Sequence, residues 1–204
     1  MKKNKILKII RYFQIYGIGR TFIKVMGRTR AIPPIKLPVS FVFRPQKDVA
    51  IIGAGQFPFC IIGYYLKKNR GKCIEGVYDV NEDNSTTFAK YYGAKVYTNS
   101  DELIHNKKVK YVYIASNHAS HTDYAIKALE AGKIVYVEKP ISVTSEQFLK
   151  LMDASKNKIL YVGYNRPLSP ALFEVYKNLN IENRFPLTLS CFITGHKLEK
   201  DHWY

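Results

Sequence analysis

The sequence has few cysteines, no long uninterrupted apolar run, and no acidic residue before Asp48. Its three cysteines are widely spaced and lack metal-ligand spacing, which favours ordinary thiols in a reducing compartment over a disulfide framework or a metal site. Lys8 and Arg11 interrupt the apolar stretch at residues 6–18, and no run reaches the roughly 18 residues that a membrane-spanning helix needs. No small-residue cleavage site follows that stretch, so we expect no secretory signal and a cytoplasmic protein.

Charge divides the chain into two regions. With 204 residues, 47% of them hydrophobic, the chain can bury the core of one ordinary domain, which excludes a wholly disordered protein. Of the 32 basic residues, 12 lie within residues 1–47, where no acid occurs; the remaining 20 accompany all 16 acids. We therefore expect a basic N-terminal arm followed by a nearly balanced globular body.

Apolar and basic residues alternate at helical spacing in the arm. The two apolar sets are Ile6, Ile9, Ile10 and Phe13, and then Phe22, Ile23, Val25 and Met26. Gly17 and Gly19 should interrupt the helix between the sets, and a linker with Pro33, Pro34 and Pro38 should follow. Such a helix suits the surface of an anionic membrane, here the inner face, or packs on its own body or a second subunit. No recognition motif supports nucleic-acid binding.

The body alternates short apolar strands with helices, which predicts an α/β fold with a doubly wound, Rossmann-type parallel sheet. The expected strands are residues 48–52, 73–78, 95–97, 109–115, 134–137 and 159–162. The expected helices are 57–68, one capped by Asn84 or Ser85 and reaching Tyr92, one capped by Ser100, 120–131, and one from a Thr144–Gln147 capping box to about Lys156.

Unusual polar residues follow the strands, and the carboxyl ends of the strands form the ligand-binding edge of such a sheet. The clusters are Gly53-Ala54-Gly55, Asp79, Ser116-Asn117-His118, Glu138-Lys139-Pro140 and Tyr164-Asn165-Arg166. Each cluster alone is weak evidence for a ligand-binding site. Together, however, the clusters place most of the unusual polar residues of the body at one rim of the sheet.

The first two clusters indicate that the ligand is a dinucleotide. Gly53 permits a tight turn, and Gly55 lets a pyrophosphate approach the amides at the start of the following helix. Pro58 replaces the third small residue of the glycine pattern. Asp79 can accept both ribose hydroxyls, and no Lys or Arg follows it before Lys90, so we expect NAD and consider NADP less favoured.

Lys139 is the predicted catalytic residue. At the end of a buried strand it should be stiffly held and partly desolvated, and its ammonium could donate to a substrate hydroxyl. The alternative is a rim lysine paired with Glu138, and Pro140 could take the cis isomer. His118 and His121 lie where a nicotinamide ribose would be, although His121 could instead cap a helix.

Four motifs in order resemble the Gfo/Idh/MocA oxidoreductases, which are glucose–fructose oxidoreductase and inositol dehydrogenase relatives. They are Gly53-Ala54-Gly55-Gln56-Phe57, Ala115-Ser116-Asn117-His118-Ala119-Ser120-His121, Glu138-Lys139-Pro140 and Gly163-Tyr164-Asn165-Arg166-Pro167. The resemblance implies NAD(P)-dependent oxidation or reduction of a sugar, cyclitol or nucleotide-sugar hydroxyl, with Lys139 as the catalytic lysine. It places Glu138 beside the nicotinamide ribose, and Asn165 and Arg166 on the nicotinamide and substrate side.

The resemblance also implies a domain division: residues 1–47 as the arm and linker, 48–166 as the dinucleotide domain, and 167–204 as the start of an α/β substrate domain. Residues 187–194 resemble the first strand of that second domain, and the family's catalytic histidine has no counterpart before Tyr204. We therefore expect a fragment of an enzyme that is homo-oligomeric at full length, in sugar or bacterial surface-polysaccharide metabolism. The alternative is a non-catalytic dinucleotide-binding module that its arm recruits to a membrane or an assembly partner.

Overall fold

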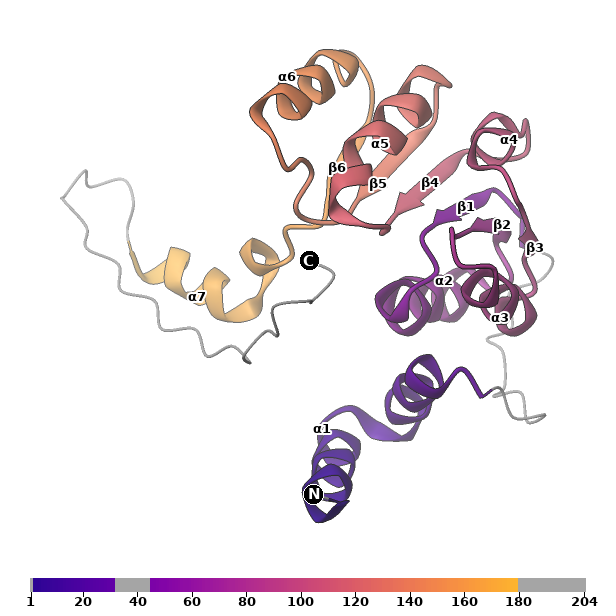
Figure 1. Ribbon diagram of the computed structural model, residues 1–204. Helices are drawn as coiled ribbons and strands as arrows, with labels where there is room; N and C mark the ends of the chain where they lie inside the picture. The colour runs from indigo at the N-terminus through magenta and orange to yellow at the C-terminus, as the bar shows by residue number, and fades with distance from the viewer. Residues whose placement is uncertain (1, 32–44, 180–204) are drawn as a thin grey trace. The chain divides into compact units, whose positions relative to one another are not determined.

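A computed structural model describes residues 2–31 and 45–179 of the chain (Figure 1). The chain divides into two compact units, one up to Val162 and one from Gly163 onward. Several expectations lie outside the described residues: the proline-rich linker, the strand at 187–194, and Cys191. The predicted boundaries at 47 and 166 stay predictions.

Six parallel strands form one sheet in the order β3-β2-β1-β4-β5-β6. The strands are β1 Val49–Ile52, β2 Ile74–Tyr78, β3 Lys95–Val96, β4 Tyr111–Ile114, β5 Ile134–Val137 and β6 Leu160–Val162. This order, reversing between β1 and β4, is that of the doubly wound dinucleotide-binding sheet. The predicted Rossmann-type α/β fold is confirmed.

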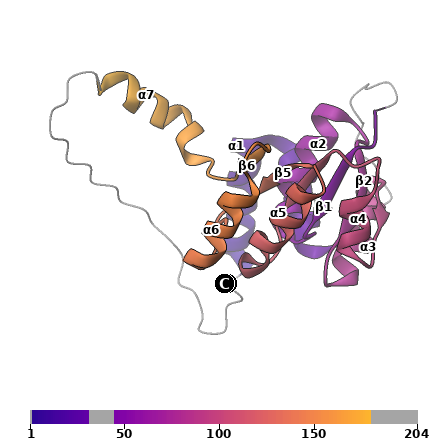
Figure 2. The same ribbon diagram turned by 90° about the horizontal axis from the view of Figure 1, so that it is seen from above.

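Helices cover both faces of the sheet, with α2 and α3 on one side and α4, α5 and α6 on the other (Figures 1 and 2). The helices are α1 Lys2–Thr29, the π-helix η1 Pro58–Ile62, α2 Gly63–Arg70, α3 Glu82–Tyr92, α4 Ser100–His105, the 3₁₀-helix η2 His118–Ser120, α5 His121–Glu130, α6 Ser145–Ala154, the 3₁₀-helix η3 Arg166–Leu168 and α7 Pro170–Asn178. Among the described residues, no helix combines the length and apolar character needed to cross a membrane.

Alternation along β1 divides the core into two layers. Val49 and Ile51 face the layer that includes Phe59, whereas Ala50 and Ile52 face the layer that includes Leu129. All four strand residues are fully buried. A strand buried on both faces needs this continuous apolar run, because successive side chains point to opposite sides.

Two predicted helix caps are wrong by a few residues. The Asn81 side chain accepts from the amides of Asp83 and Asn84, at 3.0 and 3.3 Å, so α3 begins at Glu82 rather than after Asn84 or Ser85. The Asn99 side chain accepts from the amide of Asp101 at 2.8 Å, which makes Ser100 the first helical residue and not the cap.

The arm helix α1 bends at Gly17, whose φ of 76° lies in the left-handed region, as predicted. Gly19 does not interrupt it and stays helical, which corrects the second expected break. Beyond the bend the helix packs on the body: Ile23 is fully buried, and the Arg20 guanidinium donates to the Cys60 carbonyl at 2.7 Å. The second half of α1 therefore belongs to the core, which confirms for this half the predicted alternative of packing on the body.

Replacing Ile23 tests this packing. We expect Ile23→Ala to lower the free energy of unfolding by about 2 kcal/mol or more, because it leaves a cavity under the helix. The measurement is urea denaturation of the whole chain. Ile18→Ala is the matched control: its side chain is 73% exposed, and its removal should change stability by less than about 0.5 kcal/mol. Equal effects of the two substitutions would contradict the docked arm.

Candidate functional site

The ends of the strands form one row at the carboxyl edge of the sheet. Ile52 is in register with Tyr78 on one side and with Ile114 on the other, and Ile114 is in register with Val137. The residues that follow these strand ends, Gly53, Asp79, Ala115 and Glu138, therefore leave the sheet at the same level. The predicted convergence of the first four clusters is present in the structure.

Gly53 occupies a position that only glycine can fill. Its φ is 90°, and a Cβ built there would lie 2.4 Å from the Ala115 carbonyl oxygen. Its amide donates to the Tyr78 carbonyl at 2.8 Å. The turn after β1 is therefore held closely against the ends of β2 and β4.

Gly55 faces open space: a Cβ there would meet no atom within 4 Å. Gln56 and Phe57 follow it at the start of the helical segment and are exposed, whereas Pro58 is buried in the first turn. The open space beside Gly55 lies next to the first amides of a helix. It therefore leaves room for an anionic group, such as a pyrophosphate, to approach the backbone closely.

The Asp79 carboxylate joins the end of β2 to the glycine turn. One oxygen accepts from the Ala54 amide at 2.6 Å and the other from the Asn81 amide at 2.8 Å. Each oxygen keeps a further lone-pair direction, so the carboxylate can still accept two ribose hydroxyls. Its placement fits the predicted role.

Arg30, from the end of the arm, also reaches this turn, and the sequence analysis missed it. Its guanidinium donates to the Ala54 carbonyl at 2.6 Å and to the Thr87 hydroxyl at 3.3 Å. Burial lowers the pKa of Arg30, while the Cys60 thiol and the Asp79 carboxylate act to raise it. The sequence analysis considered only the residues that follow Asp79 in the chain, and a spacing of 49 residues between Arg30 and Asp79 gave no sign of this arrangement.

His121 joins two loops and does not point at open space. It is 1% exposed, and its ring nitrogens lie 2.8 Å from the Pro140 carbonyl and 3.1 Å from the Ser116 carbonyl. Both nitrogens thus face backbone oxygens, and the nitrogen that carries the proton donates to one of them. The predicted contact of His121 with a cofactor is corrected: the residue positions the loops after β4 and β5.

The loop after β4 keeps the other predicted residues near the rim. The Asn117 side-chain oxygen accepts from the Ala119 amide at 2.8 Å, and the Ser116 and Ser120 hydroxyls lie 2.9 Å apart. Asn117 is exposed, and Ser116 and His118 are half-buried. Burial lowers the pKa of His118, and the charges of His121 and Lys139 lower it further.

Glu138 is held inside the rim, whereas Lys139 is not. Glu138 is 8% exposed and accepts from the Tyr136 hydroxyl at 2.6 Å and from the Lys139 amide at 3.2 Å. The Lys139 side chain is exposed, and its ammonium makes no ion pair with Glu138 or with any other described residue. The expected partial desolvation of Lys139 is therefore wrong in this structure. Of the alternative, a solvated rim lysine paired with Glu138, the solvent exposure is confirmed and the pairing is wrong. The Lys139–Pro140 bond is cis, as anticipated.

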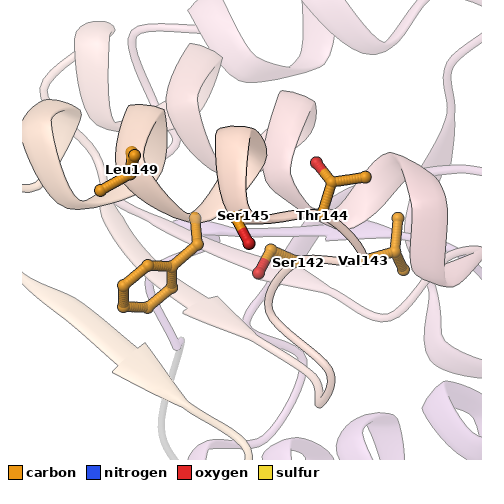
Figure 3. Close-up of a pocket in the computed structure, with 6 residues that line it drawn as sticks. Ser142, Val143, Thr144, Ser145 and Leu149 are labelled. Atoms are coloured by element: carbon orange, nitrogen blue, oxygen red, sulfur yellow. The ribbon is translucent and has the colours of Figure 1, made fainter.

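A hollow of about 440 Å³ is formed by the loop after Pro140 and the start of α6 (Figure 3). The residues that line it are Ser142, Val143, Thr144, Ser145, Phe148 and Leu149. The sequence analysis did not single out this surface, because none of these residues is chemically unusual.

Asn165 and Arg166 belong to the second unit, at the start of η3. Their predicted contact with the nicotinamide stays a prediction. Within residues 2–31 and 45–179, no three His, Cys, Asp or Glu side chains lie close enough together to hold a metal ion.

These residues fit a bound dinucleotide. Gly55 leaves room for a pyrophosphate beside the helix start, Asp79 presents acceptors at the end of β2, and Glu138 and Lys139 stand at the end of β5. A dinucleotide in this fold crosses the edge where the strand order reverses, which here is between β1 and β4.

Comparisons with known proteins agree with this geometry. Inositol 2-dehydrogenase from Serratia proteamaculans is 30% identical over 152 residues, which cover 71% of this chain and 44% of that protein. Glucose-6-phosphate 3-dehydrogenase from Bacillus subtilis is 31% identical over 148 residues, covering 71% and 41%. Biliverdin reductase from Synechocystis sp. PCC 6803, solved with biliverdin and NADP+, superposes with a TM-score of 0.59 at 25% identity, covering 66% and 43%.

The chain thus spans less than half the length of these relatives. Residues 47–165, more than half of the 204, match the family model described as an oxidoreductase family with an NAD-binding Rossmann fold. That match contains the entire six-stranded sheet and every strand end described above. The chain therefore belongs to the Gfo/Idh/MocA oxidoreductase family, and its parallel sheet is the NAD-binding Rossmann domain of that family.

Proposed function

We propose that this chain binds NAD at the carboxyl edge of its sheet. We further propose that the protein it belongs to moves a hydride between the nicotinamide and a sugar, cyclitol or nucleotide-sugar carbon. The observation that carries this proposal is the row formed by Gly53, Asp79, Ala115 and Glu138, since it brings the glycine turn, the acid and the lysine loop to one edge. The two curated relatives are named for inositol and glucose 6-phosphate, and both compounds are ring polyols.

Each predicted residue has a proposed place along the cofactor. Amides after Gly55 would hold the pyrophosphate, and Asp79 would accept the adenosine ribose hydroxyls, which favours NAD. The residues proposed to line the dinucleotide are Gly53, Gly55, Gln56, Phe57, Asp79, Ser116, Asn117, His118, Glu138, Lys139, Asn165 and Arg166. His121 acts behind them by fixing two loops.

Lys139 is the proposed catalytic residue. Bound NAD supplies a hydride acceptor. The Lys139 ammonium is exposed at the rim and has no partner among the described residues, so its three N–H groups are available to a substrate hydroxyl oxygen. A hydrogen bond from this cation stabilises the negative charge that develops on that oxygen as the hydroxyl proton passes to solvent water and the hydride passes to NAD. Buried Glu138 holds the Lys139 backbone in place through its amide.

A second proposal concerns the part of α1 that precedes the bend at Gly17, which would lie on an anionic membrane surface. The predicted apolar set is exposed there: Ile6 at 58%, Ile9 at 46%, Ile10 at 47% and Phe13 at 46%. Lys8 and Arg11 lie between them, and the arm holds no acid. An exposed apolar face flanked by cations fits the interface of anionic lipids. The proposed location would place an enzyme of surface-polysaccharide synthesis beside its membrane.

Gly55→Ala tests cofactor binding with little risk to the fold. A methyl group there contacts no protein atom, so stability should change by less than about 1 kcal/mol. Affinity for NADH, measured by titration of its fluorescence, should fall about tenfold or more because the methyl occupies the space of the pyrophosphate. Gly19→Ala in the arm is the matched control and should bind NADH normally. An unaltered affinity in Gly55→Ala would remove the glycine turn from the site.

Lys139→Ala should separate binding from chemistry. We expect NADH affinity within about twofold of the original, and, in the full-length protein to which the chain belongs, turnover lowered by about 10²–10⁴. The assay follows reduced nicotinamide with a panel of sugars and cyclitols that includes inositol and glucose 6-phosphate. Lys158→Ala removes the same charge from an exposed loop before β6, at the opposite edge, and should leave turnover unchanged. Full activity of Lys139→Ala would refute the catalytic assignment.

Flotation with lipid vesicles tests the arm. The chain should float with vesicles of phosphatidylglycerol and phosphatidylcholine, and stay behind with phosphatidylcholine alone or in high salt. Replacing Ile9 and Ile10 together by Gln should weaken partitioning about tenfold. Val25→Gln changes an exposed residue of the docked half and serves as the control. Flotation that is indifferent to lipid charge and to both isoleucines would refute membrane attachment.

A further inference from the structure

The backbone of Arg30 is in a conformation that an arginine adopts only at a cost. Its φ is 54°, and its amide closes the end of α1 by donating to the Met26 carbonyl at 2.7 Å. Helices commonly end on a residue of this conformation, but it is usually glycine or asparagine. A non-glycine residue held there points to a use for its side chain.

The side chain of Arg30 is held at the turn that carries the dinucleotide motif. Its hydrogen bonds to the Ala54 carbonyl and the Thr87 hydroxyl use two of the five guanidinium N–H groups. The guanidinium carbon lies 5.0 Å from the centre of the Phe59 ring, which limits its movement further. The Arg30 guanidinium therefore keeps further N–H donors for a ligand, and its contacts fix its position.

Arg30 and Asp79 act on the same residue from two sides. Asp79 accepts from the Ala54 amide at 2.6 Å, and Arg30 donates to the Ala54 carbonyl, also at 2.6 Å. In this fold an acid at the end of the second strand receives the ribose 2′-hydroxyl, whereas a nearby arginine accommodates a 2′-phosphate. Here both groups are present at one turn, the arginine being supplied by the arm.

We infer that Arg30 gives this site the ability to hold a 2′-phosphate, so that it accepts NADP as well as NAD. The inference rests on the proposed dinucleotide function. Asp79 disfavours the phosphate by charge repulsion, and Arg30 offsets that repulsion with a cation and a planar set of donors suited to phosphate oxygens. The preference between NAD and NADP then depends on a residue of the arm, which lies outside the glycine motif.

The experiment compares NADH and NADPH on the same variants by fluorescence titration of the whole chain. Arg30→Ala should weaken NADPH binding about tenfold or more and NADH binding by less than about threefold. Arg30→Lys keeps the charge but loses the planar fork, so it should recover part of the NADPH affinity. Arg28→Ala removes the same charge from an exposed position of the same helix and should leave the affinity ratio unchanged.

Several outcomes would overturn the inference. Equal losses for both dinucleotides in Arg30→Ala would mean that Arg30 only orders the turn or the arm, and urea denaturation of that variant would identify a folding defect. Tight NADH binding with NADPH more than about a hundredfold weaker in the original chain would exclude a phosphate site. Failure of the original chain to bind either dinucleotide would refute the proposed function, and this inference with it.

Discussion

The close contact between Gly53 and the end of β4 is the constraint on which the rest of the site depends. At a φ of 90°, with the Ala115 carbonyl where a Cβ would stand, no side chain can separate the two strands. The Gly53 amide also binds the Tyr78 carbonyl, so three strand ends meet at one turn. Because of this contact, the helical segment that follows starts beside Asp79 and leaves open space at Gly55.

The orientation of a single peptide unit follows from the two groups that bind Ala54. In a planar trans peptide the carbonyl of Ala54 and the amide of Gly55 point in opposite directions. Because the carbonyl is held by Arg30, the Gly55 amide must point away from the arm. The Ala54 amide is held by Asp79 at the same time. Donors fixed in this way need little reorganisation when an anion binds, which is the physical basis of preorganised sites.

Local patterns were enough to predict the sheet and some caps, but not the long-range contacts of the site. The strand at 134–137 and the Thr144–Gln147 cap match the structure because apolar alternation and capping are local chemistry. The cap of α3 was misplaced because several cap-forming residues occur together there, and only the end of β2 selects Asn81. His121 and Arg30 bind carbonyls up to 24 residues away, which no sequence spacing encodes.

The arm and the dinucleotide turn are therefore coupled. The docked half of α1 places Arg30 on Ala54, and burial of Ile23 together with the contact of Arg20 to Cys60 holds that half in place. Any ligand that requires the Ala54 turn in this geometry then favours the docked arm, and by reciprocity the docked arm favours that ligand. The first half of the helix, which precedes the bend at Gly17, makes none of these contacts. Because it is free of these contacts, the proposed attachment of this half to a membrane would leave the turn undisturbed, and one helix would serve two separate purposes.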